Sequence, residues 1–183
     1  MIKGNPAGAV EYLKNGKIIA YPTETVFGIG CDPYRQDSVE RIFQIKNRPS
    51  AKKFILITSS YKQLEGVVDT QKITDEVLKS WPGPNTWLVP PNKKLPKWLI
   101  SEDNGLIAVR VSKHTVVREL CEKFGKPIIS TSANLYNSAA LKNFEEVEKI
   151  FSETIDYLVI GETSKQNKPS MIKNMLTGEI IRK

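Results

Sequence analysis

Residues 17–30 read Lys-Ile-Ile-Ala-Tyr-Pro-Thr-Glu-Thr-Val-Phe-Gly-Ile-Gly. The first five have the apolar, β-branched character of a short buried strand, which Pro22 ends because proline cannot donate to a strand ladder. From Pro22 to Pro33 we expect a loop in which Gly28 and Gly30 permit close approach of the backbone. A polar loop that follows a strand is a common binding site in α/β proteins. An ordinary polar turn is the alternative, since Gly-x-Gly alone is a weak signal.

Strands and helices alternate along the rest of the chain. Asn5 and Pro6 are typical of a helix start, and Gly125 is typical of a helix end. The expected strands cover residues 17–21, 54–58, 86–89, 106–111, 127–130, 157–160 and 179–182. The expected helices cover residues 6–15, 37–48, 61–68, 74–81, 116–124 and 143–151. This alternation predicts an α/β protein with one domain over residues 1–183.

Length and composition exclude several classes of protein. The chain has 183 residues, 40% hydrophobic and 26% charged, which is ordinary globular usage and unlike a disordered chain or a collagen-like repeat. Its apolar runs are shorter than the roughly 18 residues that a membrane helix needs, and the N-terminus does not resemble a signal peptide. We therefore expect a soluble cytoplasmic protein without a membrane partner.

The rare residues limit the chemistry further. The chain has two cysteines, Cys31 and Cys121, and a single histidine, His114. So few soft ligands make a protein-bound metal site improbable and exclude two-histidine acid–base catalysis. The sequence also lacks a P-loop and a nucleophile elbow. If the protein is an enzyme, we expect it to work by positioning and electrostatics.

The charge distribution points to an anionic partner. The net charge is +7, which suits phosphate, nucleotide or nucleic acid but also serves solubility. Residues 41–64 hold six cations and no carboxylate. Within them, Lys46, Arg48 and Lys52 gather around Pro49, where they would suit a polyphosphate. A solvated helix end is the alternative interpretation.

Two further segments carry polar groups at special places. Residues 130–134, Ser-Thr-Ser-Ala-Asn, follow an apolar strand and could orient a nucleotide or an amino acid, or form a turn or a helix cap. Arg110 interrupts the apolar strand at residues 106–111. A buried unpaired cation is costly, so Arg110 either points to solvent or meets an anion such as a substrate carboxylate.

In combination, these segments resemble the YrdC-like family, most closely its short, single-domain TsaC-type members. The resemblance runs from about residue 18 to residue 179, and its motifs occur in the family's order. They are Tyr-Pro-Thr-Glu-Thr-Val-Phe-Gly at 21–28, Lys-x-Arg-Pro at 46–49, Trp-Pro-Gly-Pro-x-Thr at 81–86, Ala-Val-Arg-Val at 108–111 and Ser-Thr-Ser-Ala-Asn at 130–134. The chain departs from the family at Leu135-Tyr136-Asn137, where Leu-Ser-Gly is usual.

The resemblance implies a twisted mixed β-sheet with flanking helices and a basic concave groove. It also implies a threonylcarbamoyl-AMP synthase, which makes threonylcarbamoyl-AMP and pyrophosphate from L-threonine, bicarbonate and ATP. Mg²⁺ would be carried on the ATP phosphates. A t6A-transferase complex would accept the intermediate and modify adenosine 37 of tRNA.

Site roles follow from the matching motif positions. The implied catalytic residues are Lys46 and Arg48. The implied nucleotide-binding residues are Lys46, Arg48, Lys52, Ser132 and Asn134, and the implied threonine-binding residues are Thr23, Arg110 and Ser130.

Two other functions remain open at this stage. The basic surface could bind tRNA or double-stranded RNA, as in a ribosome-assembly factor. The chain could also be a nucleotide-binding module without catalysis.

Overall fold

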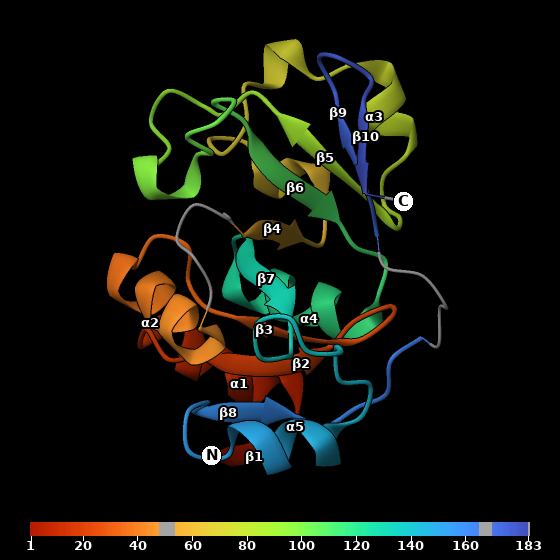
Figure 1. Ribbon diagram of the computed structural model, residues 1–183. Coiled ribbons are helices and arrows are strands. Elements are labelled where there is room, and N and C mark those ends of the chain that lie inside the picture. The colour runs from red at the N-terminus through yellow and green to blue at the C-terminus, as the bar shows by residue number, and fades with distance from the viewer. Residues whose placement is uncertain (48–53, 165–169, 183) are drawn as a thin grey trace.

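One mixed β-sheet forms the frame of the molecule (Figure 1). The computed structural model describes residues 1–47, 54–164 and 170–182. Its strands are β1 (Ile2–Gly4), β2 (Ile19–Pro22), β3 (Phe27–Gly30), β4 (Ile55–Thr58), β5 (Asn85–Val89), β6 (Ile107–Val111), β7 (Ile128–Ser132), β8 (Tyr157–Val159), β9 (Met171–Asn174) and β10 (Ile180–Arg182). They lie in the order β1-β8-β2-β3-β7-β4-β6-β5-β9-β10, with parallel and antiparallel neighbours. The expected mixed α/β sheet is therefore confirmed.

The helices begin and end where the local chemistry favours it. They are α1 (Pro6–Lys14), α2 (Gln36–Lys46), α3 (Asp75–Lys79), α4 (Thr115–Phe124) and α5 (Phe144–Phe151), with 3-10 turns η1 (Tyr61–Leu64), η2 (Thr70–Lys72) and η3 (Lys97–Leu99). The Asn5 side chain accepts the Gly8 N–H at 2.9 Å and caps α1. Gly125 adopts a left-handed φ of 84° and ends α4. No described helix combines the length and the apolar character that crossing a bilayer requires.

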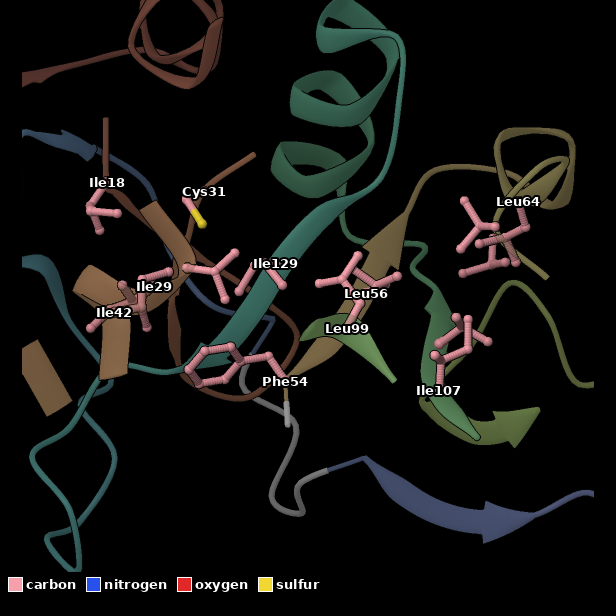
Figure 2. Close-up of a cluster of buried hydrophobic side chains, with 14 of the residues drawn as sticks. Ile18, Ile29, Cys31, Ile42, Phe54, Leu56, Leu64, Leu99, Ile107 and Ile129 are labelled. Carbon is pink, nitrogen blue, oxygen red and sulfur yellow. The ribbon is translucent and has the colours of Figure 1, made fainter. Parts of the chain in front are cut away.

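Helices cover both faces of the sheet. On one face α1 and α4 pack together over β2, β7 and β8. On the other face α2 and α5 cover a larger apolar core. Figure 2 shows part of this larger core, where Ile29, Ile129 and Leu56 come from the adjacent strands β3, β7 and β4. Both faces of the central strands are thereby removed from water.

Several elements differ from those expected. The loop expected at residues 22–33 contains strand β3, which pairs with both β2 and β7. The edge strand β1 and strand β9 were not expected. The helix expected at residues 61–68 is the 3-10 turn η1, and Gly66, at a φ of 82°, breaks the segment. The helix expected at 74–81 is the shorter α3.

Strand β3 depends on the absence of a side chain at Gly30. A Cβ atom built there would lie 2.3 Å from the Ile129 carbonyl oxygen and 3.0 Å from the Tyr21 ring. At Gly28, in the same strand, the nearest atoms would be side-chain atoms at 3.3 Å. The backbones of β3 and β7 can approach closely because residue 30 is glycine.

We predict that Gly30→Ala lowers the free energy of unfolding by about 1–3 kcal/mol, the usual effect of overpacking. Urea denaturation followed by circular dichroism measures this change. Gly28→Ala is the matched comparison and should destabilise less. Equal loss in the two variants would contradict the assignment of the tight contact to Gly30.

Candidate functional site

A cavity of about 350 Å³ opens where the β2–β3 loop, β6, β7 and the C-terminal strands meet. Its wall includes Thr23, Arg110 and Ser130, the three residues expected to hold threonine, and also Ser132. These residues come from three separate parts of the sequence, and the strand order brings them together because β7 lies between β3 and β4. The structure thus places the expected threonine-binding set on a single cavity wall, and their roles stay predictions.

Thr23 is held in a tight turn at the start of the β2–β3 loop. Its hydroxyl donates to the Val26 carbonyl oxygen at 2.6 Å, and its backbone N–H donates to the same oxygen at 3.1 Å. Both bonds fix the loop beside the cavity. Pro22 before it and the pairing of β2 with β3 add to this rigidity.

Lys46 joins the end of α2 to the chain that follows β7. Its Nζ donates to the Ser132 carbonyl at 2.5 Å, to the Asn134 carbonyl at 2.7 Å and to Asn134 Oδ1 at 2.8 Å. The Ser132 hydroxyl donates to the same Oδ1 at 2.7 Å. Three expected nucleotide-binding residues therefore form one hydrogen-bonded cluster. Ser132 lines the cavity, whereas Lys46 is 2% exposed and holds the loop behind it.

Direct contact between Lys46 and phosphate stays a prediction. An ammonium has three donors, and these contacts match them with three protein oxygens. A phosphate would have to exchange with one of those oxygens. Arg48 and Lys52, the other expected phosphate-binding cations, lie outside the described residues. Among the described wall residues the charged side chains are Arg110, Arg182 and Asp103, so the expected basic character of the groove is untested.

Asn137 occupies the place where the YrdC-like motif usually has glycine. Its φ is 62°, in the left-handed region that glycine favours and that asparagine tolerates better than most residues. The Asn134 side chain spans the same loop and donates from Nδ2 to the Ser138 carbonyl at 2.7 Å. Asparagine thus permits here the backbone conformation that glycine favours.

Arg110 meets an anion supplied by the protein itself. Its Nη2 lies 3.3 Å from Glu24 Oε2, and both side chains are buried. The Ser112 hydroxyl donates to Glu24 Oε1 at 2.6 Å and accepts the His114 N–H at 3.1 Å. The sequence left two orientations open for Arg110, toward solvent or toward an anion, and the one toward solvent is wrong because Arg110 is buried. Within the described chain, Arg110 Nε has no hydrogen-bond partner.

The charges in this network set its protonation. Burial raises the pKa of Glu24, but the Arg110 guanidinium and the Ser112 hydroxyl outweigh burial and hold that pKa below its usual value. Burial lowers the pKa of His114 from its usual 6.5, although the Glu24 carboxylate opposes this change. Glu24 is therefore ionised and His114 neutral at pH 7. His114 is the residue that directly precedes α4, and it is 6% exposed.

Sequence reasoning missed several residues that line the cavity. Among them are Ser101, Asp103, Asn104, Ser170 and Arg182. Arg182 donates from Nε and Nη2 to the Ser170 carbonyl at 3.0 and 2.9 Å, and the Thr86 hydroxyl donates to Ser170 Oγ at 3.0 Å. The arginine at position 182, in the last expected strand, was the one feature of the sequence that could have pointed to this part of the cavity. No local sequence pattern relates residue 182 to residue 170.

Metal binding has no structural support within the described ranges. There, His, Cys, Asp and Glu side chains do not gather in groups of three that could hold an ion. The expectation that Mg²⁺ travels with ATP is not tested by this observation.

Comparison with known proteins identifies similar chains. The Sua5/YciO/YrdC family model, described as telomere recombination, matches residues 11–183. The threonylcarbamoyl-AMP synthase of Vibrio campbellii is 42% identical over 177 residues, which covers 94% of this chain and 95% of that relative. The threonylcarbamoyl-AMP synthase of an Enterobacter species is 43% identical over 183 residues, with coverage of 98% and 95%.

Solved structures share the fold. P. abyssi Sua5 complexed with L-threonine matches with a TM-score of 0.89 at 26% identity, over 98% of this chain and 56% of that one. The chain therefore spans about half of that structure. E. coli YciO matches with a TM-score of 0.85 over 100% of this chain and 93% of that one, and its 23% identity supports the fold alone.

We predict that Lys46→Ala lowers the free energy of unfolding by about 1–3 kcal/mol, because buried acceptors lose their donor. Urea denaturation measures the change. Lys14→Ala is a suitable control, since Lys14 pairs with Glu11 on the exposed surface of α1 and should contribute less than about 1 kcal/mol. Unchanged stability of Lys46→Ala would show that the cluster does not anchor the loop.

We predict that the protein loses stability on acidification from pH 7 to pH 5.5. The folded-state pKa of His114 is depressed, so the unfolded chain takes up a proton first and is favoured as the pH falls below 6.5. His114 is the single histidine, so His114→Gln should flatten this dependence. Thermal unfolding at both pH values measures the change, and equal slopes for the two proteins would contradict the prediction.

Proposed function

Because the chain belongs to the Sua5/YciO/YrdC family, we propose that it is a threonylcarbamoyl-AMP synthase acting on L-threonine, bicarbonate and ATP. The observation that carries the proposal is the meeting of Thr23, Arg110, Ser130 and Ser132 on one cavity wall. Relatives of nearly the same length that are named for this activity support it.

The reaction joins three substrates in two steps. The amine of L-threonine attacks the carbon of bicarbonate-derived CO2 and loses a proton, which gives a carbamate. A carbamate oxygen then attacks the α-phosphorus of ATP, the bond to the β-phosphate oxygen breaks, and pyrophosphate leaves. This chemistry needs no protein nucleophile, because holding the carbamate in line with ATP and stabilising the charge can supply the acceleration.

The described residues fit the amino-acid half of this reaction. The Arg110 guanidinium suits a carboxylate, since charge-assisted bonds between these groups are strong. The backbone and hydroxyl groups at Thr23 and Ser130 lie on the same wall and can orient a small hydroxy amino acid. In this proposal Arg110 receives the threonine carboxylate.

In this proposal ATP is bound by the segment after β7 and by the basic segment at residues 46–52. Lys46 and Asn134 hold the backbone from which Ser132 faces the cavity. Arg48 and Lys52 would contact the phosphates, and Mg²⁺ would enter with ATP as part of the substrate. A t6A-transferase complex in the cytoplasm would then pass the threonylcarbamoyl group to adenosine 37 of tRNA.

We expect purified protein to release pyrophosphate from ATP at a rate that requires both L-threonine and bicarbonate. A coupled pyrophosphate assay measures the rate, and mass spectrometry identifies threonylcarbamoyl-AMP. Arg110→Ala should raise the KM for L-threonine at least about 10-fold and leave the KM for ATP within about twofold. Lys14→Ala is the control with unchanged kinetics.

An equal rate of pyrophosphate release with and without L-threonine would overturn the proposal. The net charge of +7 makes RNA binding the second candidate. Salt-sensitive binding of double-stranded RNA without any ATP turnover would favour it.

A further inference from the structure

Glu24 lies directly behind the part of the cavity wall that Arg110 forms. Its sequence neighbours Thr23 and Thr25 line the cavity, but Glu24 is not among the described lining residues. The Glu24 side chain is 3% exposed and the Arg110 side chain is 10% exposed. Glu24 is therefore placed to act on Arg110 without touching a molecule in the cavity.

The Glu24 carboxylate has a partner at each oxygen, a hydrogen bond at Oε1 and, at Oε2, an ion pair that does not meet hydrogen-bond geometry. Oε1 accepts from the Ser112 hydroxyl at 2.6 Å, and Oε2 lies 3.3 Å from Arg110 Nη2. Ser112 is itself fixed, because its N–H donates to the Thr58 carbonyl at 2.9 Å and its hydroxyl accepts the His114 N–H at 3.1 Å. The carboxylate thus links the β2–β3 loop to the end of β6 and the start of α4.

This anchoring limits the orientations open to Arg110. An arginine side chain has several rotatable bonds, and the attraction between Glu24 Oε2 and Arg110 Nη2 at 3.3 Å favours the conformations that keep the guanidinium beside this carboxylate. The Arg110 Nε is buried and finds no hydrogen-bond partner in the described chain. The guanidinium therefore keeps unused donors while the Glu24 carboxylate attracts one of its edges.

We propose that Glu24 is a positioning residue, which orients the Arg110 guanidinium toward the carboxylate of the amino-acid substrate through their buried ion pair. Ser112 supports it by fixing the other carboxylate oxygen. This inference rests on the proposed function for the identity of the substrate. In this role Glu24 acts through Arg110, since Glu24 is not among the described residues that line the cavity.

The test compares steady-state kinetics of Glu24→Gln, Glu24→Asp and Ser112→Ala with those of the unaltered protein. Glutamine keeps the shape and removes the charge, so we expect the KM for L-threonine to rise at least about 10-fold, the loss of roughly 1.4 kcal/mol. The KM for ATP should stay within about twofold. Aspartate keeps the charge and should restore part of the loss. Ser112→Ala leaves the ion pair intact and should raise the threonine KM less than Glu24→Gln.

Asp32→Asn is the matched control. Asp32 is also a buried carboxylate, and it pairs with Lys126 at 2.7 Å outside the cavity wall. Its substitution should lower the unfolding temperature without changing the threonine KM. A general effect of removing a buried charge is thereby separated from an effect on Arg110.

Calorimetric titration with L-threonine and a crystal structure of Glu24→Gln complete the experiment. We expect weaker threonine binding and a displaced Arg110 guanidinium.

A folded Glu24→Gln protein with unchanged threonine KM, or with threonine and ATP KM values that rise together, would overturn the positioning role. If Glu24→Gln does not fold, an unchanged threonine KM in Ser112→Ala overturns it. An unaltered protein without threonine-dependent pyrophosphate release would instead refute the proposed function, and an unmoved guanidinium in the crystal would still refute the positioning role.

Discussion

The antiparallel pairing of β3 with β7 is the contact on which the cavity depends. It sets Gly28 opposite Ser132 and Ile29 opposite Thr131, so the loop before β3 and the polar end of β7 lie side by side. A side chain at position 30 would meet the Ile129 carbonyl and separate these strands. The two segments that carry most of the expected polar groups therefore converge because two backbones can pack without an intervening Cβ.

Two buried cations then use this frame in different ways. Lys46 donates to carbonyl oxygens at the end of β7 and just after it, and this holds the following loop in place. Arg110 is balanced by Glu24 and is still one of the residues that line the cavity. A buried charge is costly unless it has partners, so both cations depend on the protein, Lys46 through hydrogen bonds and Arg110 through an ion pair. The same partners define where the positive charge lies before any substrate arrives.

The sequence predicted the local features and much of the cavity wall. Short-range chemistry was enough to predict the α/β class and the helix caps at Asn5 and Gly125. The matching motifs were enough to predict the shared site of Thr23, Arg110, Ser130 and Ser132. Strand β3 could not be predicted from the sequence. Its two glycines have low strand propensity, and it forms because pairing with the neighbouring strands outweighs that low propensity. The ion pair of Glu24 with Arg110 and the contact of Arg182 with Ser170 join residues that no local spacing relates. Such contacts are set by the strand order.

The cavity wall draws on both Thr23 and Arg182, two residues separated by almost the full length of the chain. Strand β10, which carries Arg182, pairs with β9 at one edge of the sheet (Figure 1). During synthesis on the ribosome, the central strands can assemble while this edge is still inside the exit tunnel. A nascent chain therefore lacks the Arg182 part of the cavity wall until β10 has left the tunnel and paired with β9.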